Sequence, residues 1–90
     1  MSDKPPLEEL LDYPALFTFR VVASVRDDLE EEVRGIIVRI LDRPLTQVSR
    51  RPSSNGAFMS IRVSVVVTSA AEIRSVYAEL HPIDGLRMLL

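Results

Sequence analysis

The chain has 90 residues, with 13 acidic and 11 basic side chains, a net charge of −2 and no cysteine. This length fits one domain, and a hydrophobic content of 47% is enough for a small core. The lack of cysteine excludes disulfides, thiolate zinc sites and cysteine nucleophiles. The acidic balance argues against bulk affinity for nucleic acid. No apolar run approaches the roughly 20 residues of a membrane span, and no secretion signal opens the chain, so we expect a cytoplasmic protein.

Residues 1–14 are predicted to form an N-terminal tail with a short helical lead-in. Leu7, Leu10 and Leu11 recur at helical spacing between Pro6 and Pro14. The tail precedes a domain that we expect to span residues 15–90.

A strand and a helix are predicted next. Apolar and polar residues alternate over Leu16–Ser24, which is the two-residue period of a half-buried strand. Asp27 or Asp28 is expected to cap a helix with an apolar stripe over Leu29–Leu41. Gly35 costs this helix about 1 kcal/mol relative to alanine, so we expect a strand to approach closely there.

The middle of the chain predicts a hairpin. Leu45–Arg51 is a short polar strand suited to the edge of a sheet. A Pro-Ser-Ser-Asn-Gly turn follows at 52–56. In the next strand the odd-numbered residues from Ala57 to Val67 are expected to face the core, and the even-numbered residues from Phe58 to Val66 to face outward.

A second helix and a last strand complete the pattern. Ser69 and Glu72 form the signature of a capping box, and the helix stops before Pro82. Leu86–Leu90 is a strand in which two residues are expected to face outward, Arg87 and Leu89.

The order β-α-β-β-α-β, with each helix apolar on one side only, predicts an α+β two-layer sandwich. A ferredoxin-like arrangement satisfies the short connections and the right-handed crossovers. Its antiparallel sheet has the strand order 4-1-3-2, and the helices cover only one of its faces.

Three arginines are predicted to lie side by side on the uncovered face: Arg20, Arg62 and Arg87. An arginine row on an acidic protein can hold a small anionic metabolite or an acidic protein segment. Alternatively, the arginines only solvate the sheet while their stems cover apolar neighbours. The apolar residues expected on the same face, which would equally suit a homodimer interface, are Val22, Phe58 and Leu89.

The Pro-Ser-Ser-Asn-Gly turn admits two interpretations. Its amides and serines, flanked by Arg50 and Arg51, could bind an anion. The alternative is a plain hairpin loop in which Asn55 and Gly56 adopt positive φ angles. A phosphate loop would lead into a helix, whereas a strand follows here, so the hairpin is favoured.

The residue pattern indicates no catalysis, cofactor or metal site. His81 is the only histidine and has no paired ligand or nucleophile in view. RNA-recognition motifs share the predicted topology, but they stack bases on aromatics of both central strands. Only Phe58 is predicted to face outward here. We therefore expect neither an enzyme nor a nucleic-acid-binding protein.

Several motifs occur together: Leu10–Pro14 with Phe17–Val21, Arg51–Gly56, and Ile83–Asp84 with Leu86–Leu90. This combination resembles the YbeD-like family of small bacterial proteins of unknown function, from which Phe58 departs where the family has a tyrosine-like residue. The resemblance implies a ferredoxin-like fold similar to ACT-type regulatory domains, which bind small molecules and pair through their sheets. It also implies a lipoate-related regulatory role.

The sequence therefore predicts a small regulatory or ligand-binding module for an anionic metabolite. Lipoate would need an apolar groove that ends in a cation, and Arg20 or Arg87 beside Val22 and Leu89 could provide one. The alternative is an interaction module that dimerises or docks through the uncovered sheet without a ligand. The predicted ligand-binding residues are Arg20, Arg62, Arg87, Phe58 and Ser60.

Overall fold

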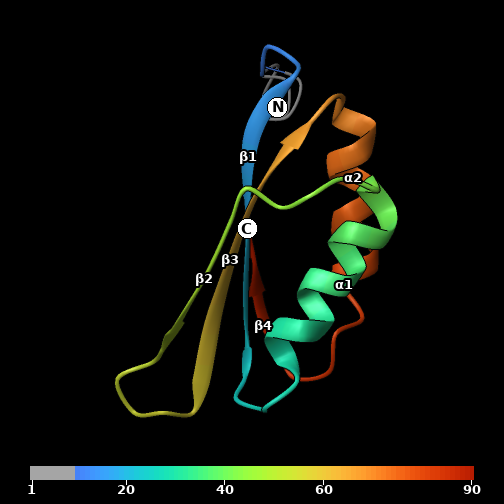
Figure 1. Cartoon of the computed structure of the whole chain (residues 1–90). Helices are drawn as coiled ribbons and strands as arrows, with labels where there is room; N and C mark the ends of the chain where they lie inside the picture. Colours follow the sequence, from blue (N-terminus) through green and yellow to red (C-terminus); the bar gives the residue numbers. More distant parts are fainter. Residues whose placement is uncertain (1–9) are drawn as a thin grey trace, which may run out of the picture.

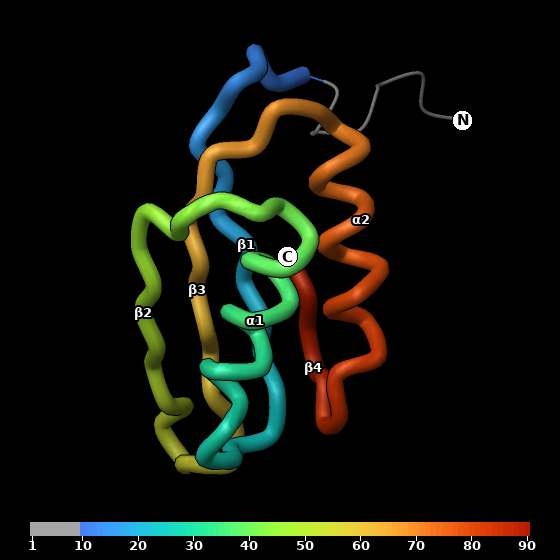
Figure 2. The backbone as a smooth tube through the Cα atoms, turned by 45° about the vertical axis from the view of Figure 1, so that its right-hand side comes forward, coloured from blue at the N-terminus to red at the C-terminus, as the bar shows by residue number. Residues whose placement is uncertain are grey.

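A computed structural model of the chain describes residues 10–90. Figures 1 and 2 show a sheet with both helices on one side, and no element of residues 10–90 covers the other side. The elements are β1 (Ala15–Ser24), α1 (Leu29–Leu41), β2 (Gln47–Pro52), β3 (Phe58–Val67), α2 (Ala70–Leu80) and β4 (Leu86–Leu89). The antiparallel sheet has the order β2-β3-β1-β4, which is the predicted order read from the other edge. The ferredoxin-like fold is confirmed.

The two central strands pair over their whole length, from Ala15 opposite Val67 to Ser24 opposite Phe58. Because side chains alternate between the faces of a strand, the odd-numbered residues of both strands meet the helices. The fully buried residues of β1 and β3 are Phe19, Val21, Ala23, Ile61, Val63, Val65 and Val67. The helices bury Leu29, Val33, Ile37, Ile73, Val76 and Leu80 against them. This confirms the inward and outward assignments predicted for β1 and for residues 58–67 of β3. Ala57, which was predicted to face the core, precedes β3 and is exposed, because it belongs to the turn.

The aromatic residues of β1 belong to the core. The ring of Phe19 lies edge-on to Phe17 and to Tyr77 of α2, with centroids 4.8 and 5.4 Å apart. Edge-to-face contacts of this kind contribute about 0.5–1.5 kcal/mol beyond burial. Phe17 and Phe19 are therefore unavailable as a stacking platform on the uncovered face.

Of two local predictions about α1, one holds in part and the other is wrong. Asp28 occupies the N-cap position as predicted, but its carboxylate accepts a hydrogen bond from Nη1 of Arg26 at 2.6 Å instead of capping a helix amide. Gly35 is exposed, and a Cβ atom there would meet nothing within 4 Å. The sheet packs on the other side of the helix, so no strand approaches this glycine.

A β-bulge at Arg87 changes the phase of β4. Met88 and Leu86 lie opposite adjacent residues of β1, so Arg87 is an extra residue in its strand. Leu89 therefore packs against the core, whereas Met88 and Leu90 lie on the uncovered face. The prediction that Leu89 faces outward is wrong, because a strict two-residue period cannot locate a bulge.

The predicted helical lead-in begins at residues outside the described part of the chain, and it stays a prediction. Within residues 10–90, no helix is both long and apolar enough to cross a membrane.

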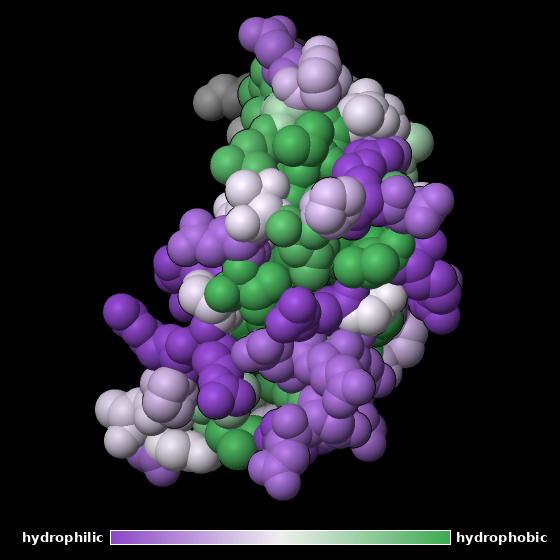
Figure 3. All heavy atoms as spheres, in the orientation of Figure 1, coloured by the Kyte–Doolittle hydropathy of each residue, from purple (hydrophilic) through white to green (hydrophobic). Residues whose placement is uncertain are grey.

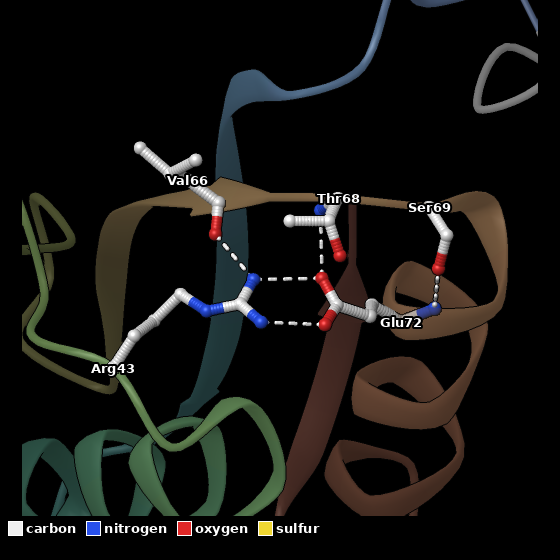
Figure 4. Close-up of polar contacts among 5 residues, drawn as sticks. All are labelled: Arg43, Val66, Thr68, Ser69 and Glu72. Carbon is white, nitrogen blue, oxygen red and sulfur yellow. Dashed lines mark hydrogen bonds and ion pairs between the residues drawn. The ribbon is translucent and has the colours of Figure 1, made fainter.

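Arg43 joins the end of α1 to β3 and α2 (Figure 4). Its guanidinium donates to both carboxylate oxygens of Glu72, at 2.7 and 2.6 Å, and to the carbonyl oxygen of Val66 at 2.8 Å. The carboxylate of Glu72 also accepts from the backbone N–H of Thr68 at 2.7 Å. Ser69 caps α2 as predicted, since its Oγ accepts from the N–H of Glu72 at 3.2 Å. The other half of the capping box is replaced by the bonds to Arg43 and Thr68.

Removing the carboxylate charge tests how much this pair stabilises the fold. We expect Glu72→Gln to lower the free energy of unfolding at neutral pH by about 1–3 kcal/mol, because a two-pronged, charge-assisted pair is lost. Glu79→Gln is the matched control on the same helix, because Glu79 is exposed and lies 3.7 Å from Arg39. It should change stability little. Equal losses in urea unfolding of the two variants would contradict this account.

The same pair predicts a pH dependence. Hydrogen bonding by Arg43 lowers the pKa of Glu72 from 4.5 to about 2, so the folded protein binds this proton less readily than the unfolded chain does. The stabilisation is complete above about pH 4.5 and is lost as the pH falls through about 2. The difference in unfolding free energy between wild type and Glu72→Gln should shrink over that interval. A constant difference would be the contrary result.

Candidate functional site

The uncovered side of the sheet, which we call the arginine face, is built from cross-strand rows of side chains. From β2 to β4, the first row consists of Ser49, Arg62, Arg20 and Leu90. The second row consists of Arg51, Ser60, Val22 and Met88. Three arginines and two serines thus occupy neighbouring positions in these two rows, with apolar side chains toward β4.

The arginines of this face have no carboxylate partner among residues 10–90, whereas most other arginines do. None of the four strands contains an acidic residue. The arginines that lie within 4 Å of a carboxylate are Arg26, Arg34, Arg39, Arg43 and Arg50. Those on the arginine face, which form no ion pair in the described part, are Arg20, Arg51, Arg62 and Arg87. In the described part of the chain, the arginines without an ion pair therefore gather on this face, with the exception of Arg74 on α2.

Figure 3 shows the side of the molecule where α1 and β2 lie. Hydrophilic side chains cover its lower half, and hydrophobic ones form a band above them. Glu30 of α1 lies within ion-pair distance of both Arg34 and Arg50, at 3.4 and 3.9 Å. Arg50 is therefore paired with α1, although it also borders the arginine face beside Arg51.

Two guanidinium-bearing residues stand directly opposite each other at the centre of the sheet. Arg20 and Arg62 are cross-strand partners, and the Nε of Arg20 donates to Oγ of Ser60 at 3.3 Å. Like charges in this position destabilise a sheet. An arrangement that opposes stability without a compensating partner is typical of a functional site.

A second contact lies at one end of the arginine face. The guanidinium carbon of Arg87 is 4.9 Å from the ring centroid of Phe58, which is a cation–π contact between β4 and β3. The bulge in β4 places Arg87 there.

Two adjoining hollows lie on the arginine face. The first, of about 200 Å³, is lined by Arg20, Ser49, Arg50, Arg51, Ser60 and Arg62. The second, of about 180 Å³, is lined by Arg20, Val22, Arg51, Pro52, Ser53, Phe58, Met59 and Ser60. The two hollows are continuous, because they share Arg20, Arg51 and Ser60. The first is the more cationic end, and the second is the more apolar one. A larger hollow of about 780 Å³ lies beside β4 and α2, where Arg87 is the only arginine.

The predicted site residues are thus placed in two groups. Arg20, Arg62 and Ser60 line the first hollow, and Phe58 lines the second. Arg87 lies over Phe58 and lines neither hollow. The predicted row of three arginines is therefore wrong at Arg87, because the bulge places Leu90 beside Arg20 instead. All five lie on the arginine face.

Sequence reasoning missed Arg51 as a member of the site. The sequence pattern places Arg51 at the end of an edge strand beside the turn, but not on the arginine face, where it lies opposite Ser60. The alternation of Ser49 and Arg51 along β2 was a usable signal. To assign these residues to a face, one also needs the register of the hairpin, which pairs Pro52 with Met59.

Several polar groups of the turn at 53–57 bond to one another. Oδ1 of Asn55 accepts from the N–H of Ala57 at 3.0 Å, and Oγ of Ser53 accepts from the N–H of Phe58 at 3.1 Å. Gly56 has a φ of +74° and donates its N–H to the carbonyl of Ser53 at 3.0 Å. Asn55 does not share the positive φ predicted for it. These amides are engaged within the turn, so the hairpin interpretation holds.

Comparison with known proteins identifies the family. Residues 8–90 match the family model described as "Protein of unknown function (DUF493)". The chain belongs to the DUF493 family. It is 40% identical over 82 residues to a UPF0250 protein of Shewanella loihica, covering 91% of this chain and 92% of the relative. It is 32% identical over 84 residues to UPF0250 protein PM1928 of Pasteurella multocida, covering 93% and 94%.

Solved structures with the same fold place this DUF493 member beside ACT domains. The solution structure of HP0495 from Helicobacter pylori gives a TM-score of 0.76 at 23% identity, covering 99% of this chain and 90% of that one. The ACT domain from GTP pyrophosphokinase of Chlorobium tepidum gives 0.68 at 12% identity, covering 83% and 94%. The predicted resemblance to a bacterial family of unknown function with an ACT-like fold is confirmed.

Relieving the central repulsion tests the electrostatics of the arginine face. We expect Arg62→Gln to raise the free energy of unfolding at low salt by a few tenths of a kcal/mol, because it removes a like charge opposite Arg20. Added salt should erase the gain. The control is Arg74→Gln, because Arg74 is an exposed residue of α2 away from this face, and it should show no such gain. A loss of stability in Arg62→Gln at low salt would contradict the repulsion.

Proposed function

We propose that this DUF493 protein is a non-catalytic regulatory module that binds a small anionic metabolite on its arginine face. The observation that carries the proposal is the group of unpaired arginines on a sheet whose strands contain no acidic residue. A bound anion would supply the missing negative charge. It would also relieve the repulsion between Arg20 and Arg62, so binding and stability are coupled.

The chemistry around the site supports binding over catalysis. No group of three or more His, Asp or Glu within residues 10–90 could hold a metal ion. The serines of the face are flanked by arginines and not by a histidine or carboxylate that could accept their protons. Arginine remains protonated at all working pH values and is suited to holding charge in place.

Lipoate is the first metabolite to test, because the resemblance implies it. Its carboxylate would lie against Arg20, and its apolar chain would cross the second hollow toward Val22 and Phe58. Leu89, which we expected to line this groove, packs against the core instead. Met88 takes its place on the arginine face.

Calorimetric titration tests the proposal. With lipoate, octanoate and acidic amino acids as ligands, we expect at least one to release heat, and Arg20→Ala to weaken that ligand about tenfold or more. Arg74→Ala is the control, because this exposed arginine of α2 lies off the arginine face. Heat that Arg20→Ala leaves unchanged would rule the arginine face out as the binding site.

A second candidate function is docking of an acidic protein segment on the same face. Four large apolar residues there are exposed by 41–60%: Leu16, Val66, Met88 and Leu90. A second copy of the chain is the weaker partner, because face-to-face packing would oppose two sets of unpaired arginines. Light scattering should give the monomer mass of 10.1 kDa. A dimer that persists with and without metabolites would instead favour an interaction module.

A further inference from the structure

The first hollow gathers more positive charge than one carboxylate can neutralise. Arg20, Arg51 and Arg62, which have no carboxylate partner in the described part, all line it together with Ser49 and Ser60. Arg50 lines it as well, but its charge is offset by Glu30 at 3.9 Å. A monocarboxylate would offset one of the three charges and leave two guanidinium groups in repulsion. A head group with two charges offsets most of them.

The donor set also matches the shape of a phosphoryl group. Each guanidinium presents a planar fork of N–H donors that pairs two oxygens at once. A phosphate monoester carries about −1.5 to −2 charges at neutral pH and three terminal oxygens. Arg20 of β1, Arg62 of β3 and Arg51 of β2 approach from three adjacent strands, so each fork can take a different pair of those oxygens.

The second hollow defines what the head group is attached to. It shares Arg20, Arg51 and Ser60 with the first, and it leads past Val22 to the ring of Phe58. Arg87 lies over that ring at 4.9 Å. The two volumes, about 200 and 180 Å³, together reach the lower end of the 300–1,000 Å³ range of small-molecule sites. The space accommodates a short apolar chain or a single ring.

We infer that the arginine face selects a phosphate monoester with a small apolar or aromatic body over a monocarboxylate of the same body. The inference rests on the proposed function and deepens it. Arg51 becomes a specificity-determining residue, because it adds the third guanidinium that a carboxylate does not need.

A matched pair of ligands tests this selectivity. Octyl phosphate and octanoate carry the same eight-carbon chain on different head groups, and inorganic phosphate carries no chain. In calorimetric titrations of the full chain at one ionic strength, octyl phosphate should bind at least about tenfold more tightly than either of the others.

Variants at Arg51 separate the head groups. Arg51→Ala should weaken octyl phosphate about tenfold or more and octanoate much less, and Arg51→Lys should give a smaller loss because it keeps the charge without the fork. The side chain is exposed on an edge strand, so unfolding curves should stay close to wild type. Arg74→Ala is the control that should change neither ligand.

The outcomes distinguish the inference from the function on which it rests. If octanoate binds as tightly as octyl phosphate, or if Arg51→Ala weakens both equally, the phosphoryl selectivity is wrong and the proposed anion site stands. Inorganic phosphate binding as tightly as octyl phosphate would remove the role of the second hollow. If no anion binds, both proposals fall.

Discussion

The unbroken pairing of β1 with β3 determines what lies on each side of this protein. Side chains alternate along a strand, so the residue next to each one buried under the helices lies on the opposite face of the sheet. Burial of Phe19, Val21, Ile61 and Val63 thereby places Arg20 directly against Arg62. Each buried apolar side chain contributes about 1.5–3 kcal/mol, whereas a like-charged cross-strand pair costs less than about 1 kcal/mol. The core can hold these two arginines together without any attraction between them.

One residue type therefore serves two purposes in the molecule. On the helix side, Arg43 bonds to Glu72 and to the end of β3, and it holds α2 against the sheet. On the arginine face, the partners of Arg20, Arg51 and Arg62 across the β1–β3 and β2–β3 pairs are serines or another arginine. The net charge of −2 conceals this division, because the acidic residues of the described part lie outside the strands. The local field of the sheet, and not the net charge, decides which ligands it attracts.

Periodicity was enough to predict the strands and helices, because a two-layer fold buries one side of every element, and the rules for their connections then predicted the sheet order. It also placed Arg20 and Arg62 on the correct face, since both lie in regular strands. It failed where the backbone leaves its period: the extra residue Arg87 turned Leu89 inward, and no residue pattern marks that bulge. Arg51 was missed because an edge strand without an apolar face shows its orientation only through the register with its neighbour.

The central claim is that the arginine face binds anions, and chemical-shift mapping tests it most directly. In an NMR titration of isotope-labelled protein with octyl phosphate, the account predicts shifts at the amides of β1, β2 and β3 and at the Nε–H groups of Arg20, Arg51 and Arg62. Arg20→Ala should remove them. Shifts confined to the hollow between β4 and α2, around Tyr77 and His81, would contradict the account, as would no shifts at saturating ligand.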